Sequence, residues 1–391
     1  MIKKTVCIIF ALLTVLLEGC WNSHDITDLG IVTALGIDKA ADGNIELTAQ
    51  MIAASNQDTS QSGSSQRGSK STIEVSSEGT TMFEAARNMI PKLSKKAYYA
   101  QIQLVVISQS IAKEGLDKIW DFFERDHEVD RLFRVVVVNN GTAKSIIEAT
   151  APAESIGSVE ISDTIDNTSF GKTVKIQAFS VSELLGEPLT GLVTGVINPE
   201  GTQKLTDMKI EGGAVFKKAK LAGFLDADET RGYLFASNQI KNTILTIASP
   251  KEIGNQVSIE LIGSNGKLTV DLINGKPKLG IEIKAYGNIG DEQGSADLTD
   301  LDDVKKLESE SAALISENVR EMLKKSQKTL DSDILNFNDM LYKHNYNDFE
   351  KIKGNWNKLY ADATISIKVQ FLIKRSGIIK KPAFDSSMSG E

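Results

Sequence analysis

The spacing of apolar residues predicts that strands and helices alternate along the first part of the chain. Period-two or nearly continuous apolar runs predict strands over 31–38, 45–53, 73–76, 102–107 and 133–138. Apolar residues at helical spacing predict helices over 82–93, 111–123 and 142–149. The first of these helices opens with a capping box formed by Thr81 and Glu84. This alternation indicates an α/β layer with a mixed sheet.

After residue 200 the pattern becomes richer in strands. Short apolar runs predict strands over 210–216, 220–225, 233–235, 243–248, 257–263, 267–272 and 279–286. Asn265-Gly266 and Asn274-Gly275 are both typical of hairpin turns. The remaining pattern predicts helices over 300–325 and 331–342 and a long alternating strand over 363–374. Acidic residues near 300 and lysines near 325 complement the dipole of the longer helix.

These elements predict a multidomain protein of mixed α+β and α/β class, with mixed sheets, packed helices and a strand-rich middle region. We expect an N-terminal α/β domain over 20–200, a strand-rich domain over 201–290 and a helix-plus-strand domain over 291–391. The Ser/Gln/Gly-rich stretch 55–71 is predicted to be a mobile loop. The apolar, small-residue stretch 191–199 suggests packing between domains or an exposed partner surface.

The first twenty residues have the features of a lipoprotein signal peptide. Lys3 and Lys4 precede an apolar run over 6–17, which is too short to span a bilayer as a helix. Leu17, Gly19 and Cys20 then follow the lipobox pattern, which predicts cleavage after residue 19 and lipidation of the Cys20 thiol. Glu18 departs from that pattern, and an ordinary secretory signal with a chance cysteine is the alternative.

The charge and the cysteine content narrow the possible functions. Removal of residues 1–19 takes away two lysines and one glutamate, so the formal net charge changes from −8 to −9. An acidic chain of this kind does not suggest a nucleic-acid partner, and its attachment to a membrane would depend on the lipid. Cys7 would be removed and Cys20 acylated, which excludes cysteine nucleophiles, zinc–thiolate sites and iron–sulfur clusters from the mature chain.

No pattern of catalytic residues is apparent. The three histidines share no metal-ligand spacing, and phosphate-loop, nucleophile-elbow and zinc-protease motifs are missing from the sequence. His127 lies among acidic residues, which we interpret as a polar helix end rather than a cation site. The pairs Asp302/Asp303 and Asp331/Asp333 stand where helix starts favour acids. We therefore expect no enzyme, no cofactor and no metal site.

Several segments together resemble the Ger(x)C family, the C subunits of spore germinant receptors. The start Gly19-Cys20-Trp21-Asn22 and the strand 31–38 carry part of the resemblance, although the family usually has an acidic residue after the tryptophan. Further similar segments occur in the same order along the chain, at 79–85, 103–116, 212–217, 220–225, 229–232 and 333–337, with Trp356 and Val369 near the end.

The resemblance implies a lipid-anchored, non-catalytic subunit on the outer face of the spore inner membrane of a Gram-positive spore former. It implies integral membrane partners: an A subunit with a large soluble part and a permease-like B subunit. The complex would sense nutrients and start germination. A solute-binding lipoprotein of an importer is the alternative, although such carriers usually alternate strands and helices throughout, unlike residues 208–286.

Overall fold

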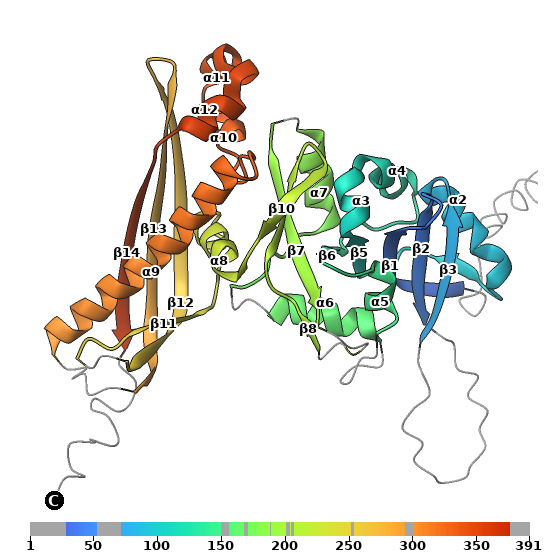
Figure 1. Cartoon of the computed structure of the whole chain (residues 1–391), viewed down its shortest axis with the longest axis horizontal. Helices are drawn as coiled ribbons and strands as arrows, with labels where there is room; N and C mark the ends of the chain where they lie inside the picture. Colours follow the sequence, from blue (N-terminus) through green and yellow to red (C-terminus); the bar gives the residue numbers. More distant parts are fainter. Residues whose placement is uncertain are drawn as a thin grey trace, which may run out of the picture.

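The computed structural model describes residues 29–52, 72–149, 156–167, 171–187, 189–200, 204, 207–251, 254–293 and 300–375. The predicted signal peptide, Cys20 and the predicted loop 55–71 lie outside these residues. The described chain forms two sheets with helices packed on them, which confirms the predicted mixed α/β class (Figure 1).

The first sheet has ten strands within the described residues, and its centre is parallel. Strands β1, β5, β6 and β7 run parallel in that order, and antiparallel strands extend the sheet at both sides in the order β10-β9-β7-β6-β5-β1-β2-β3. The strands are β1 (Leu29–Lys39), β2 (Ile45–Ile52), β3 (Thr72–Gly79), β4 (Lys96–Tyr98), β5 (Leu104–Ser108), β6 (Arg134–Val138), β7 (Gly191–Pro199), β8 (Met208–Lys209), β9 (Gly213–Lys217) and β10 (Lys220–Leu225).

Helices cover both faces of this sheet because its central strands are apolar on both sides. Val105 and Ile107 face one core, whereas Leu104 and Val106 face the other. The helices are α2 (Met82–Asn88), η3 (Ile90–Lys92), α3 (Gln109–Glu114), α4 (Asp117–Arg125), α5 (Ala143–Ile147), α6 (Gly157–Asn167) and α7 (Ala178–Gly186). Figure 1 shows α3, α4 and α7 on one side of the sheet and α5 and α6 on the other.

The second sheet is a long, twisted ribbon with helix α9 lying across one face (Figure 1). Its strands pair in the order β11-β12-β13-β14, and the β13–β14 pair is parallel. The strands are β11 (Ile244–Ala248), β12 (Gln256–Ile273), β13 (Lys276–Glu292) and β14 (Ile365–Arg375). The helices are α8 (Ala227–Ala236), α9 (Leu301–Lys328), α10 (Phe337–His344), α11 (Tyr346–Ile352), η5 (Lys353–Asn355) and α12 (Trp356–Asp362).

Three local predictions for the second half of the chain are wrong. Residues 233–235 are part of helix α8 rather than a strand, because Asp226 and Glu229 form a capping box that starts a helix. Asn265-Gly266 lies within β12, and only Asn274-Gly275 turns the hairpin, with positive φ at both residues. The helix predicted to start at 331 begins at Phe337, because Asp331 and Asn336 take left-handed backbone conformations.

The strands predicted over 201–290 do not form one sheet. Strands β8, β9 and β10 extend the first sheet, whereas β11, β12 and β13 pair with the C-terminal strand β14. The apolar segment 191–199 is the buried strand β7 between β6 and β9, so it is not an exposed partner surface. Its first residue, Gly191, packs against the segment 332–334 from the second half of the chain, which agrees with the predicted inter-domain packing. The strands after residue 200 divide between the two sheets because they pair with segments far away in the sequence. The local spacing of apolar residues does not encode such pairing.

Candidate functional site

The predicted lipidation site precedes the first described strand. Cys20 lies outside the described residues, and β1 begins nine residues later at Leu29. The first residues of β1 pair in parallel with β4, with Leu29 opposite Lys96 and Ile31 opposite Tyr98. The amino end of the described chain therefore lies beside β4, which forms part of the cavity described next.

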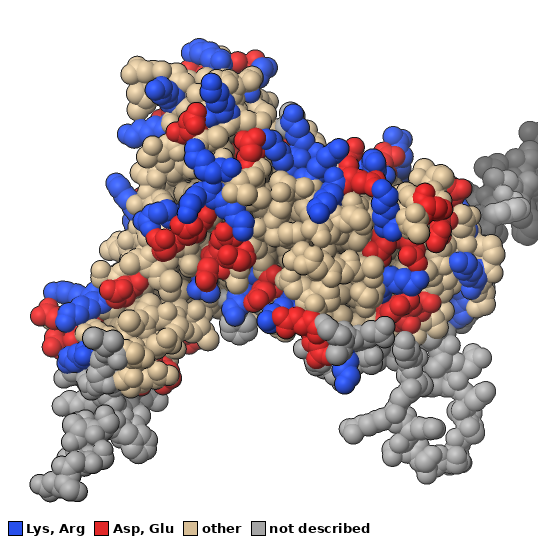
Figure 2. Space-filling model, viewed as in Figure 1, with Lys and Arg blue, Asp and Glu red and all other residues tan. Residues whose placement is uncertain are grey.

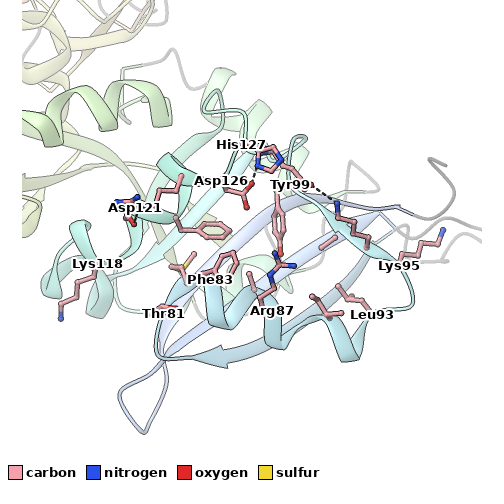
Figure 3. Close-up of a pocket in the computed structure, with 18 of the residues that line it drawn as sticks. Thr81, Phe83, Arg87, Leu93, Lys95, Tyr99, Lys118, Asp121, Asp126 and His127 are labelled. Atoms are coloured by element: carbon pink, nitrogen blue, oxygen red, sulfur yellow. Dashed lines mark hydrogen bonds and ion pairs between the residues drawn. The ribbon is translucent and has the colours of Figure 1, made fainter. Parts of the chain in front are cut away.

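A cavity of about 810 Å³ opens between α2 and η3 on one side and α4 and β4 on the other (Figure 3). Apolar side chains form much of its lining: Met82, Phe83, Ala86, Ile90, Leu93, Ala97, Tyr99 and Phe122. Charged and polar side chains complete it: Thr81, Arg87, Ser94, Lys95, Lys96, Lys118, Asp121, Arg125, Asp126, His127 and Glu128. The site is thus amphipathic, and its volume falls within the usual range of small-molecule sites.

Helix α2 and the turn η3 carry apolar side chains that are not buried in the core, and these side chains line the cavity. The apolar positions at helical spacing in the predicted helix 82–93 form one face, of which Met82, Ala86 and Met89 are buried. Phe83 and Ile90 are 55% and 52% exposed. The reason is the short length of α2, which ends at Asn88 before the single turn η3 begins with Pro91 near its start. The sequence signal for this site was therefore an apolar face on the predicted helix that is wider than one short helix can bury.

The charged residues of the cavity are only partly paired with one another. Arg125 donates to Asp121 at 2.7 Å, and the Lys96 ammonium lies 2.9 Å from the Glu128 carboxylate. The Arg87 guanidinium stacks over the Phe83 ring, 4.9 Å from its centroid.

Tyr99 lies at the inner wall of the same cavity. Figure 3 shows Arg87 and Tyr99 pointing toward one another there. Burial raises the pKa of the Tyr99 hydroxyl to about 12, and the carboxylate of Asp126 adds to that shift. Tyr99 therefore stays protonated at neutral pH and can donate a hydrogen bond into the cavity.

His127 and the acids around it lie at one end of the cavity. His127 follows helix α4 and lines the cavity. Among the residues that the structure describes, no group of three or more His, Cys, Asp or Glu side chains could hold a metal ion. Asp302 and Asp303 lie in the first turn of α9, where Asp300 is the N-cap.

The second place where distant segments meet is the junction of the two sheets. The backbone N–H of Gly191 in β7 donates to the Asp333 carbonyl at 3.1 Å and to Asn336 Oδ1 at 2.9 Å. Ser332 Oγ donates to the Phe216 carbonyl in β9 at 3.2 Å. The segment 331–336 is thus held to the first sheet by one backbone–backbone hydrogen bond and two bonds between side chain and backbone, and the helices that follow start from this fixed segment.

Asp333 is the most perturbed carboxyl at this junction. Its Oδ2 accepts hydrogen bonds from the Asn338 backbone N–H at 3.0 Å and from Trp356 Nε1 at 3.1 Å. Burial outweighs these donors and raises the pKa of Asp333 to about 6. As predicted, Asp333 is an acid at a helix start, because it accepts from backbone N–H groups in the first turn of α10. Its burial at the junction, which raises its pKa, was not predicted.

Two surface findings bear on membrane and nucleic-acid partners. Within the described ranges, no helix is long and apolar enough to cross a membrane. On the face in Figure 2, Lys and Arg side chains are interspersed with Asp and Glu over both sheets, and this face carries no continuous basic stripe.

Fold and cavity together define a two-sheet α/β protein with an amphipathic cavity in its first sheet layer. Two family models match it: "Spore germination protein N-terminal domain" over residues 22–197 and "Spore germination B3/ GerAC like, C-terminal" over residues 211–377. Together they cover most of the chain, which belongs to the GerAC-type, or Ger(x)C, family of spore germination proteins, as its sequence pattern predicted.

Individual relatives match over nearly the full length. Spore germination protein KC of Bacillus subtilis is 29% identical over 402 residues, covering 98% of each chain. The putative spore germination protein YfkR of the same organism is 25% identical and covers 97% of this chain and 99% of its own. The crystal structure of the GerBC protein has a TM-score of 0.56 at 18% identity, covering 87% of this chain and 96% of that one, and so shares the fold.

Proposed function

We propose that this chain is the lipid-anchored, non-catalytic C subunit of a nutrient germinant receptor that takes part in spore germination. The observation that carries the proposal is the family match over both halves of the chain, with spore germination proteins aligned over its full length. In this proposal Cys20 carries diacylglycerol and holds the chain to the outer face of the spore inner membrane. The A and B subunits of the receptor are the partners.

A non-catalytic role agrees with the chemistry of the described residues. The cavity contains one histidine, His127, and the acids near it are Asp121, Asp126 and Glu128, of which Asp121 and Glu128 are engaged in ion pairs. This arrangement offers no nucleophile with an adjacent base.

The proposal is tested in spores that carry Cys20→Ala in place of the native protein. We expect loss of the protein from the inner-membrane fraction and slower germination with nutrients, because a thioether-linked lipid cannot form without the thiol. Germination triggered by a route that bypasses nutrient receptors should be unchanged. Cys7→Ala is the matched control, since that cysteine lies in the predicted signal peptide. Full membrane retention and normal nutrient germination of Cys20→Ala spores would refute the anchoring role.

A further inference from the structure

We propose that the cavity between α2 and α4 binds the headgroup and adjoining apolar part of an anionic phospholipid at the membrane surface. This inference rests on the proposed function, because it takes the chain to be anchored close to a bilayer. The lining supplies both chemistries that such a ligand needs. Met82, Leu93 and Phe122 offer apolar contact inside, and cations surround the opening.

The charge balance of the cavity favours an anion. Its lining holds Arg87, Lys95, Lys96, Lys118 and Arg125 against three acids, Asp121, Asp126 and Glu128. Ion pairs occupy Lys96 and Arg125 within the cavity, and Lys118 pairs with Glu114 outside it. In the part of the chain that the structure describes, Arg87 and Lys95 have no carboxylate partner. Arg87 is therefore available for a phosphate group inside the cavity, and Lys95 is available for one at its outer edge (Figure 3).

The rim of the cavity has the composition of a membrane-facing surface. Phe83 and Ile90 project from α2 and η3 with more than half of their side chains exposed, and both lie next to Arg87. A group of exposed apolar side chains beside cations matches the interfacial region of a bilayer, where apolar groups meet charged headgroups.

The position of the cavity also places it near the proposed anchor. Strand β4, which forms one wall, pairs with the first residues of β1. Leu29 is nine positions after Cys20, and a fully extended segment of that length spans at most about 30 Å. The lipid on Cys20 therefore limits how far the cavity can move from the membrane. A second lipid contact would fix the orientation of the tethered chain.

The test uses the mature chain from residue 20 with Cys20→Ser, so that binding does not depend on lipidation. Co-sedimentation is compared for vesicles of phosphatidylcholine alone and vesicles that also contain phosphatidylglycerol. We expect binding to the anionic vesicles only. The double variant Arg87→Gln/Lys95→Gln should bind them about 25-fold more weakly, because each cation near an anionic surface contributes about fivefold. Lys267→Gln/Lys278→Gln removes the same charge from exposed lysines of the second sheet and should bind normally.

A second measurement separates the cavity from general electrostatics. Short-chain, water-soluble phosphatidylglycerol should raise the melting temperature of the Cys20→Ser chain by mass action. Ser94→Phe places a bulky side chain at the cavity from an exposed lining position without a change in charge, and should abolish this stabilisation while melting normally without ligand. Inorganic phosphate and octanoate serve as the headgroup and tail controls and should have little effect.

Three results would overturn the proposal. One is a failure of the Cys20→Ser chain to bind anionic vesicles, which would indicate that this face contacts a protein and not a lipid. Another is an equal loss of vesicle binding in Arg87→Gln/Lys95→Gln and in the control Lys267→Gln/Lys278→Gln, which would show that only the net charge of the protein matters. The third is full stabilisation by octanoate or phosphate without binding to vesicles, which would assign the cavity to a soluble ligand. Since Cys20 is replaced throughout, none of these results depends on the anchoring experiment in spores.

Discussion

Substitution of Asp333 by asparagine should change how the stability of this protein depends on pH. The carboxyl is buried at the junction of the two sheets, and its pKa is raised from 3.8 to about 6. A carboxyl with a raised pKa binds its proton more tightly in the folded state than in the unfolded state. Its contribution to stability is therefore full at low pH and is lost as pH rises from about 4 to about 6.

The size of the effect follows from the difference between the two pKa values. A shift from 3.8 to about 6 means that ionisation of Asp333 costs about 3 kcal/mol more in the folded state than in the unfolded state. The native chain loses this amount of stability between low and neutral pH. Asparagine has nearly the same shape and no charge, and its oxygen can accept the hydrogen bonds from Asn338 N–H and Trp356 Nε1. Relative to the native chain, the variant should therefore gain about 3 kcal/mol in free energy of unfolding between pH 4 and pH 7.

The assay is urea unfolding of the Cys20→Ser chain and its Asp333→Asn variant at a series of pH values. The difference between the two free energies isolates Asp333, because all other titrating groups are common to both proteins. Asp331→Asn is the matched control, since that side chain is 53% exposed and its ion pair with Lys217 should contribute less than about 1 kcal/mol. A difference for Asp333→Asn that stays constant from pH 4 to pH 7 would refute the reasoning.

Two further predictions concern helix α8. Gly232→Ala would place a Cβ 2.2 Å from the Asn318 carbonyl oxygen of α9, so we expect a loss of about 2 kcal/mol or more in thermal unfolding; Gly186→Ala, with open space around it, should be harmless. Equal melting temperatures for the two variants would contradict the α8–α9 contact. Asp226→Ala removes the capping bonds to the first turn and should cost about 1 kcal/mol in urea unfolding, whereas Asp228→Ala should cost less; the reverse order would disprove the cap.

The sequence alone determined a helix or strand wherever its apolar residues followed one clear period and no turn or capping residues interrupted it. The central strands of the first sheet were predictable because Leu104 to Ile107 are apolar at every position, which only burial on both faces satisfies. The long helix α9 was predictable from its apolar stripe and from Asp300 at its start. Local signals of this kind involve residues a few positions apart, so the chain itself contains all the information they need.

The tertiary structure alone decided how those elements pair and where the cavity lies. The strand-rich stretch after residue 200 divides between two sheets because β9 pairs with β7, whereas β13 pairs with β14 some eighty residues further along the chain. The cavity exists only because α4 and the residues after it pack against α2 and β4. Asp333 becomes a buried carboxyl only when Trp356 packs over it. Contacts between distant residues set each of these properties, and no local period encodes them.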